Sequence, residues 1–277
     1  MSTNYQEGFV SMPDGQDLYY RVSGPKKSKG AILMAHGLGE HCGRYEDISA
    51  YLNEKSYQVY RYDHRGHGKT PGRRAYVDRF SDLYEDMGHM VDFVERDSGF
   101  KKPYLIAHSF GGQVAVNFLK NYPNKVRSVV LSAPNLKLAM EIGLAKKHLG
   151  RLFSYLLPTF SINNEVNPEH ISRDPKVVES YKKDPLIEKN ITLRLGAMIL
   201  DNLEEVLSLA PWIKVPTFIF HGTDDKIVSV EGSKLFYEGL SIKEKKLKLY
   251  SGFYHECLHD LGKEEVYEDV LNWLKIN

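Results

Sequence analysis

A serine followed by two glycines stands between an apolar strand and an apolar helix, and this arrangement constrains the fold more than any other part of the sequence. The apolar run Tyr104 to Ala107 predicts a buried strand, and the stretch after Gly112 carries apolar residues at a helical period. Gly111 and Gly112 permit the sharp turn that brings strand and helix close together. Such a turn presents the Ser109 hydroxyl beyond the strand end, which is the layout of a nucleophile elbow.

The residues that a serine nucleophile requires follow later in the chain. A serine hydroxyl reacts poorly near neutral pH without a base, and the base needs an orienting group. An apolar strand, Thr217 to Phe220, runs into a turn that holds Asp224 and Asp225. A second, alternating strand precedes His255. Because serine, acid and histidine each follow a strand, we expect them to meet at one edge of a sheet.

Two choices within this set stay open on the residues alone. Asp224 and Asp225 are adjacent, so at most one of them faces the histidine, and we expect the other to cap the turn. His255 competes with His259, four residues on, because the two would share a face if a helical turn begins there. We favour His255 as the base and a supporting or surface position for His259.

Stabilising a negatively charged substrate oxygen needs two N–H donors near the serine. The residue after the nucleophile, Phe110, supplies the first of these donors in elbows of this kind. The second donor comes from a loop after an earlier strand. Gly30 to Ala35 predicts such a strand, and residues 36–39 form a glycine-rich loop. The Leu38 N–H is therefore the predicted second donor.

Strand and helix patterns alternate along most of the chain, which predicts an α/β fold with a mostly parallel sheet and helices on both faces. Between residues 135 and 211 the pattern changes, and no strand is evident there. The stretch Leu136 to Leu157 is instead dense in apolar residues. We therefore expect a core of residues 1–134 and 212–277, with residues 135–211 inserted as a helical cap.

Composition excludes several classes of protein. A length of 277 residues with 42% hydrophobic residues suits one sizeable α/β domain, and a net charge of +1 without a basic stripe argues against nucleic-acid binding. No stretch has transmembrane length and no signal peptide is visible, which predicts a cytoplasmic protein, at most peripheral to a membrane. The two cysteines make no disulfide framework.

No metal or other cofactor is expected. His36, His41, His64 and His67 lie in loops after predicted strands, but no set of cysteines or carboxylates completes a ligand count around them. A serine, histidine and aspartate can hydrolyse an ester without a metal.

Five segments, HGLGEHCGRY, YRYDHRGHGKTPG, AHSFGG, HGTDDKIV and YSGFYHE, resemble the monoacylglycerol lipase and lysophospholipase group of serine hydrolases. The resemblance spans nearly the whole chain and implies the α/β-hydrolase fold. It also implies that Ser109 is the nucleophile and His255 the base. In the H-G-x-x-D pattern of the group, Asp225 stands at the acid position. The chain departs from the group at Ala107, where a glycine is usual.

The resemblance carries over four further positions. Leu38 and Phe110 match the donors of the oxyanion hole, and Glu40 and Arg44 match polar positions on the glycerol side of the site. His259 is offset by one residue from a histidine that the group has near its site, so its role stays open.

The resemblance implies a serine hydrolase that cleaves carboxylic esters of one-tailed lipids, with monoacylglycerol as the first expectation. A lysophospholipase or a short-chain carboxylesterase is the alternative, and a ligand-sensing protein with little turnover is disfavoured by the complete set of three residues. A lipid tail needs an apolar wall. We expect Leu136 to Leu157 to supply it as a partly mobile lid, with Leu152 facing the channel and the cap making transient contact with a membrane surface.

Overall fold

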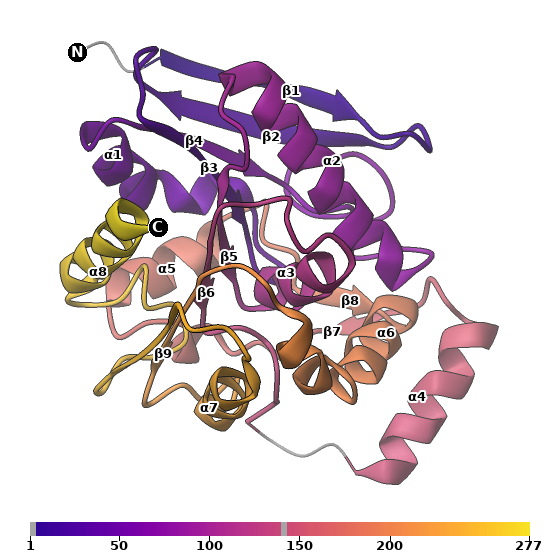
Figure 1. Cartoon of the computed structure of the whole chain (residues 1–277). Helices are drawn as coiled ribbons and strands as arrows, with labels where there is room; N and C mark the ends of the chain where they lie inside the picture. The colour runs from indigo at the N-terminus through magenta and orange to yellow at the C-terminus, as the bar shows by residue number, and fades with distance from the viewer. Residues whose placement is uncertain (1–3, 140–142) are drawn as a thin grey trace.

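An eight-stranded sheet runs through the computed structural model, which describes residues 4–139 and 143–277 (Figure 1). The strand order is β1-β2-β4-β3-β5-β6-β9-β10. The first two strand pairs in this order are antiparallel, and all later neighbours are parallel, which confirms the expected α/β fold. The strands are β1 (Asn4–Ser11), β2 (Asp17–Gly24), β3 (Gly30–Ala35), β4 (Tyr57–Tyr62), β5 (Tyr104–His108), β6 (Val129–Ser132), β9 (Thr217–Gly222) and β10 (Lys245–Tyr250).

Helices cover both faces of this sheet. One face packs on α1 (Glu46–Glu54) and α8 (Lys263–Ile276), which lie beside each other in Figure 1. The other face packs on α2 (Phe80–Ser98), α3 (Phe110–Asn121) and α7 (Val230–Gly239). In the described part of the chain, no helix is both long enough and apolar enough to cross a bilayer.

Alternation along the strands divides the core between the two faces. In β3, Ile32 and Met34 belong to the cluster under α1 and α8, whereas Leu33 and Ala35 belong to the cluster under α2 and α3. Side chains in a strand point alternately to opposite faces, so a strand buried on both sides is apolar throughout. This is why the runs that the sequence marks as buried strands lie at the centre of the sheet.

The segment between β6 and β9, which we call the inserted segment (residues 135–211), has elements of its own. They are α4 (Leu144–Leu156), β7 (Ser161–Asn163), η2 (Pro168–His170), α5 (Pro175–Lys183), β8 (Asn190–Thr192) and α6 (Leu193–Leu203), followed by η3 (Val206–Trp212), which ends one residue beyond the segment. The expectation that it contains no strand is wrong, because β7 and β8 form an antiparallel pair. Strands of three residues are too short to show an alternating pattern.

Helix α4 lies at the periphery of the molecule, beside α6 (Figure 1). Ion pairs hold one side of α4 to this neighbour. Arg151 pairs with Asp201 on α6 and with Glu204, the residue directly after α6. Residues 140–142, which belong to the apolar stretch that the sequence marks as a lid, lie outside the described residues.

Candidate active site

Ser109 occupies the turn between β5 and α3 in a backbone conformation that few residues adopt. Its φ is 51° and its ψ is −116°, a combination that costs about 1–3 kcal/mol for a residue with a side chain. The two glycines that follow make room for this turn. A Cβ on Gly111 would lie 2.5 Å from the carbonyl oxygen of His36, and one on Gly112 would lie 2.7 Å from Cβ of Pro134. The sequence signal for an elbow thus corresponds to a strained turn that only small residues fit.

Ser109, His255 and Asp225 form one hydrogen-bonded line. Ser109 Oγ lies 2.9 Å from His255 Nε2, and His255 Nδ1 lies 2.6 Å from Asp225 Oδ2. An ionised carboxylate only accepts hydrogen bonds, so Nδ1 carries the proton and Nε2 accepts from the serine hydroxyl. The three residues meet because they follow the parallel strands β5, β9 and β10, whose carboxyl ends share one edge of the sheet. This is the geometry in which a histidine can remove the proton from a serine.

The Asp225 carboxylate is fully buried and accepts four hydrogen bonds. Its Oδ2 accepts from His221 Nε2 at 2.9 Å as well as from His255. Its Oδ1 accepts from the N–H groups of Ile227 at 2.8 Å and Val228 at 2.9 Å. Burial alone raises the pKa of Asp225, but the two histidines outweigh it and hold that pKa below its ordinary value. The carboxylate therefore stays ionised, and His221 is a contributor that sequence reasoning missed.

Asp224 does not take part in this line. It is exposed, and its carboxylate accepts from the Thr223 hydroxyl at 2.9 Å. The expectation that the second aspartate caps the turn is wrong, because the turn N–H groups donate to Oδ1 of Asp225 itself. One side chain thus orients His255 and closes its own turn.

The charges around His255 raise its pKa above the ordinary value of a histidine. Burial lowers the pKa of His255, but Asp225, Glu256 and Glu40 together raise it above the usual value of about 6.5. Because only the neutral imidazole can act as a base, we expect kcat/KM for a neutral ester to fall as the pH drops through this raised pKa. A profile from about pH 5 to about pH 9 measures the inflection. An acid limb that bends clearly below about 6.5 would contradict the assignment of His255.

The N–H groups predicted for the oxyanion hole belong to residues on the cavity wall beside Ser109. Leu38 and Phe110 both line this cavity. Within residues 4–139 and 143–277, neither N–H donates a hydrogen bond to another group of the chain. For Phe110 the reason is its place at the first residue of α3, where a helix offers no internal acceptor. Two free donors near the serine could hold a negatively charged oxygen.

The loop that carries Leu38 is held by buried hydrogen bonds. The Gly37 N–H donates to Glu40 Oε1 at 2.6 Å, and the His64 N–H donates to His36 Nε2 at 2.9 Å. Burial lowers the pKa of His64 to about 3, so its ring stays neutral inside the loop. These contacts fix the backbone direction of the loop before any substrate arrives.

A cavity of about 140 Å³ opens beside Ser109. Its apolar wall consists of Leu38, Phe110, Leu138, Val166, Ile171, Ile199, Ile227 and Val228, and its polar side chains are Glu40, His108, Asn135, Asn164, Tyr181, His255 and Glu256. Seven of these residues belong to the inserted segment, so the cavity lies between that segment and the edge of the sheet. Glu40, Glu256 and Tyr181 surround Arg44, and His108 lies against His255 beside them; we call this part the polar end of the cavity. An apolar wall with such a polar end is typical of a site for a small amphipathic molecule.

Arg44 lies between two buried carboxylates at the polar end of the cavity. It donates to Glu40 Oε2 at 2.6 Å and, with two nitrogens, to the Glu256 oxygens at 2.6 Å and 2.7 Å. Of the two polar residues predicted to bind substrate, the structure places Glu40 on the cavity wall and Arg44 behind it. Sequence reasoning missed Glu256, because an acidic residue next to a histidine gives no sign of burial.

His259 supports this ion network and does not contact the serine. Its Nδ1 lies 3.1 Å from Glu256 Oε2 and its Nε2 lies 3.0 Å from the carbonyl oxygen of Arg44. Among the described residues no hydrogen bond joins His259 to Ser109. Its placement agrees with the supporting position favoured from the sequence.

Leu152 is not in the cavity, which corrects the prediction that it faces a channel. Its side chain lies on α4 and is 54% exposed. The apolar composition of a segment does not determine which face of a helix turns toward the core. The face of α4 that carries Arg151 turns toward α6 and leaves Leu152 outside. From the stretch Leu136 to Leu157, only Leu138 reaches the cavity wall among the described residues.

Known proteins resemble this chain over most of its length. A family model described as serine aminopeptidase, S33, matches residues 26–262. A monoacylglycerol lipase of Mycolicibacterium smegmatis is 27% identical over 275 residues, which cover 99% of this chain and 98% of that protein. An uncharacterized abhydrolase domain-containing protein of Dictyostelium discoideum is 33% identical over 265 residues, which cover 95% of this chain but only 28% of that protein.

One solved structure combines similar sequence with similar fold. The crystal structure of Paleococcus ferrophilus monoacylglycerol lipase matches with a TM-score of 0.84 and 33% identity, and the match covers 93% of this chain and 98% of that one. The segment matched by the family model contains Ser109, Asp225 and His255.

Proposed function

The chain belongs to the serine aminopeptidase S33 family of hydrolases, in its monoacylglycerol lipase-like group, and from this membership we propose that it cleaves the ester of a one-tailed lipid through Ser109. The observation that carries the proposal is the hydrogen-bonded line from Ser109 through His255 to Asp225 at the wall of a cavity. The family description refers to a peptidase, but the relatives named above that have an assigned activity are lipases. The bond that we propose for cleavage is therefore an ester.

The first half of the reaction forms an acyl-enzyme. His255 Nε2 takes the proton of Ser109 Oγ as that oxygen attacks the ester carbon. The carbonyl oxygen becomes negatively charged, and the N–H groups of Leu38 and Phe110 are placed to stabilise it. His255 then gives the proton to the departing alcohol, while Asp225 stabilises the imidazolium that exists in between.

The second half regenerates the enzyme with water. A water molecule gives a proton to His255 Nε2 as it attacks the acyl carbon, and the same two N–H groups hold the oxygen. The proton returns to Ser109 Oγ when the carboxylic acid leaves. No metal or other cofactor enters either half.

The cavity favours a substrate with one apolar tail and a small polar alcohol. The acyl tail would lie along the apolar wall, and the alcohol at the polar end beside Glu40 and Glu256. Monoacylglycerol has this build, and it is the substrate in the names of the lipases that this chain resembles. Purified protein tested on monoacylglycerols, lysophosphatidylcholine and p-nitrophenyl esters of increasing length decides the class. Faster hydrolysis of the short p-nitrophenyl esters than of the lipid esters would favour a short-chain carboxylesterase, and a folded protein without turnover would refute the proposal.

We propose further that the inserted segment is the cap of this site and that Leu138 contacts the acyl tail. Leu138→Asn should reduce kcat/KM for dodecanoyl esters far more than for acetyl esters, because each buried methylene contributes about 0.8 kcal/mol. Leu152→Asn makes the same change on the exposed face of α4 and serves as the matched control. The ratio of long-ester to short-ester kcat/KM, measured below the micellar concentration, reads the effect. Equal ratios in the two variants would contradict a tail-binding role.

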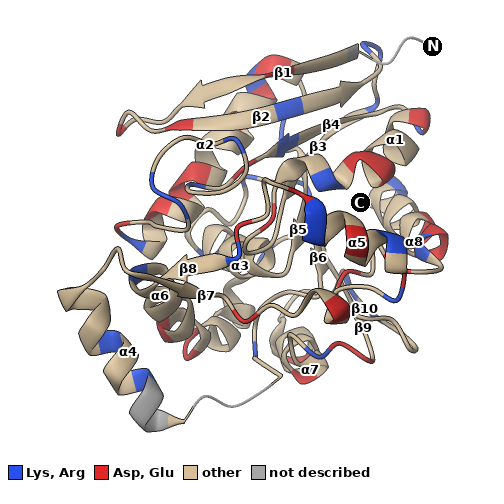
Figure 2. Cartoon of the chain, turned by 180° about the vertical axis from the view of Figure 1, so that it is seen from behind, with Lys and Arg blue, Asp and Glu red and all other residues tan. Residues whose placement is uncertain are grey.

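The outer surface of the cap is a candidate for transient contact with lipid. Large apolar side chains are exposed there, and they are Leu149, Leu152, Phe153, Tyr155, Leu156, Leu157, Phe160 and Ile162. Helix α4 carries lysine and arginine and no acidic residue (Figure 2), but Lys147 and Arg151 are paired with Asp201 and Glu204, so the apolar side chains would carry the contact. Sedimentation with anionic vesicles tests this contact: Leu152→Asn combined with Leu156→Asn should weaken binding and leave hydrolysis of dissolved short esters unchanged.

A further inference from the structure

The polar end of the cavity holds a surplus of negative charge. Among the described residues, its wall contains two glutamates and no lysine or arginine. Glu40 is 3% exposed and Glu256 is 4% exposed, and both share the single cation Arg44 behind the wall. Burial raises the pKa of each glutamate, but Arg44 outweighs it and holds each pKa below the ordinary value. The two carboxylates on the wall thus share one guanidinium behind it, and Glu256 also contacts the ring of His259 there.

Three histidines lie at this end: His108 and His255 line the wall, and His259 lies behind it with its Nδ1 3.1 Å from Glu256 Oε2. His108 lies against the ring of His255, with the ring centroids 4.8 Å apart. Burial and the neighbouring His255 lower the pKa of His108 to about 4, so it is neutral at physiological pH. Asp225 lies behind His255 and adds a further buried negative charge. The charged groups that act most strongly on His255 are therefore the carboxylates of Asp225, Glu256 and Glu40, and Arg44 and His259 lie behind Glu256.

The leaving group of the proposed reaction belongs at this end. His255 Nε2 delivers a proton to the alcohol oxygen, so that oxygen must lie beside His255 when the ester bond breaks. Glu256 follows His255 directly in the chain and lines the same wall. Any charge carried by the alcohol would consequently meet the carboxylates at short range inside a buried site, where Coulomb interactions are strong.

We propose that Glu256, together with Glu40, selects the alcohol part of the substrate by charge: neutral and cationic leaving groups are accepted, and leaving groups with a phosphate or carboxylate are rejected. This inference rests on the proposed ester hydrolysis and narrows its substrate class. Of the one-tailed lipids, monoacylglycerols satisfy the condition and acyl-glycerol phosphates do not. Glu40 also accepts the Gly37 N–H that holds the predicted oxyanion loop, so Glu256 is the residue at which charge can be changed with less effect on that loop.

Three butanoyl esters of similar size test the proposal on the whole chain. They are the esters of 4-hydroxybenzamide, 4-hydroxybenzoate and 4-hydroxyphenyl-trimethylammonium, which are neutral, anionic and cationic. Each kcat/KM is divided by the rate of hydroxide hydrolysis of the same ester, which removes differences in intrinsic reactivity. We expect the normalised value for the anionic ester to be at least about tenfold below the other two.

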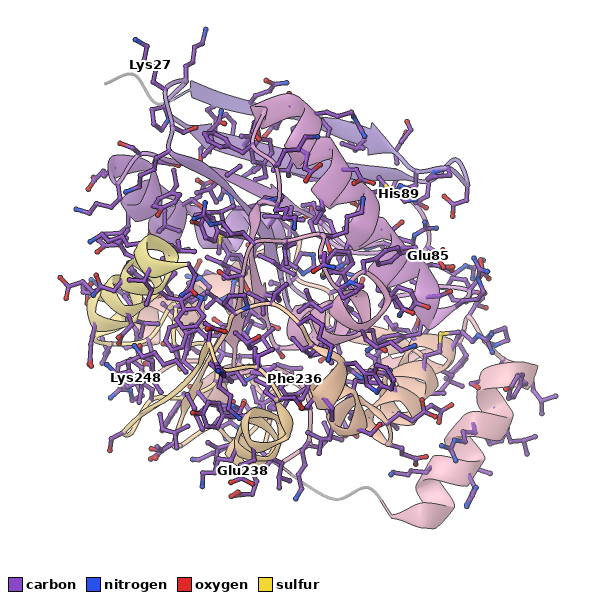
Figure 3. All side chains as sticks on the ribbon, in the orientation of Figure 1. Lys27, Glu85, His89, Phe236, Glu238 and Lys248 are labelled. Carbon is purple, nitrogen blue, oxygen red and sulfur yellow. The ribbon has the colours of Figure 1, made fainter. Side chains whose placement is uncertain are left out.

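Glu256→Gln removes one negative charge with little change of shape. The gap is the ratio of normalised kcat/KM for the neutral ester to that for the anionic ester, and this variant should reduce it by at least about fivefold. The matched control is Glu238→Gln on α7, whose labelled side chain lies at the outside of the molecule in Figure 3 and is exposed. It should leave the gap unchanged. Circular dichroism and thermal unfolding show whether each variant is folded.

The outcomes separate this inference from the function on which it rests. If the folded wild-type protein hydrolyses none of the esters, the proposed function fails. If it hydrolyses all three at equal normalised rates, or if folded Glu256→Gln keeps the wild-type gap, charge selection by Glu256 is wrong and ester hydrolysis stands. If Glu256→Gln fails to fold, the wild-type protein decides the question. Release of fatty acid from 1-acylglycerol phosphate and from 1-acylglycerol at equal rates would then overturn the proposal.

Discussion

Replacing Ser109 by alanine is expected to abolish ester hydrolysis and leave the fold intact. The proposed reaction passes through a covalent bond to Ser109 Oγ, and no other hydroxyl has a hydrogen bond to His255 within the described residues. Loss of the nucleophile of a comparable line of residues costs on the order of 10⁶ in kcat. Alanine is smaller than serine and forms no new contact, so the elbow turn should survive with unchanged thermal unfolding.

A fluorophosphonate probe gives an independent measurement of the same residue. It should label the wild-type protein on the peptide that carries Ser109 and should not label Ser109→Ala. Ser251→Ala is the matched control, because Ser251 is exposed in the loop before His255. This control should keep wild-type activity and labelling. Activity of Ser109→Ala within about tenfold of wild type would rule out the proposed nucleophile.

The sheet could be predicted from the sequence because its central strands are buried on both faces. Such strands read as continuous apolar runs, and Gly30–Ala35 has the same bounds in the structure as in the prediction. Other bounds differ at the ends. The strand predicted over Thr217 to Phe220 continues to Gly222 in the structure, where β10 pairs with its last two residues. The sequence shows where apolar residues lie, whereas pairing decides where a strand ends.

The serine, the histidine and the aspartate could be found because each follows a strand in a known order. The structure brings Ser109, His255 and Asp225 within hydrogen-bonding distance, while their chemical roles stay predictions that Ser109→Ala, Asp225→Asn and the pH profile of kcat/KM test. The choice of Asp225 over Asp224 came from the family pattern. Only the three-dimensional turn explains it, because the neighbouring backbone N–H groups hold Asp225 inward and leave Asp224 in solvent.

Contacts between distant segments could not be read from the sequence. The rotation of α4 depends on ion pairs to α6, so Leu152 is exposed although its neighbours have the composition of a channel wall. The burial of Glu256 depends on Arg44, which lies 212 residues earlier in the chain. Each charged residue on its own has the appearance of a surface residue. Their pairing becomes visible only when the loops after β3 and β10 meet.

Replacing Asp225 by asparagine is expected to lower kcat by about 10⁴ with the fold retained. The N–H groups of Ile227 and Val228 donate to Oδ1, so the oxygen of the new amide must stay on that side. The amide nitrogen then takes the place of Oδ2 and presents its own hydrogens to His255 and His221. Because Nδ1 of His255 can no longer donate there, the ring favours the tautomer protonated at Nε2, which cannot accept the Ser109 proton.

Asp224→Asn is the matched control, since it makes the same chemical change one residue away on an exposed side chain. Its only hydrogen bond from another side chain in the described residues comes from the Thr223 hydroxyl, which an amide oxygen accepts equally well. We therefore expect wild-type kcat and a change in stability within about 0.5 kcal/mol. Steady-state kinetics on one soluble ester compares the two variants. If Asp224→Asn is the crippled protein and Asp225→Asn is nearly normal, the acid is assigned to the wrong residue, because tautomer control of His255 belongs to whichever carboxylate its Nδ1 contacts.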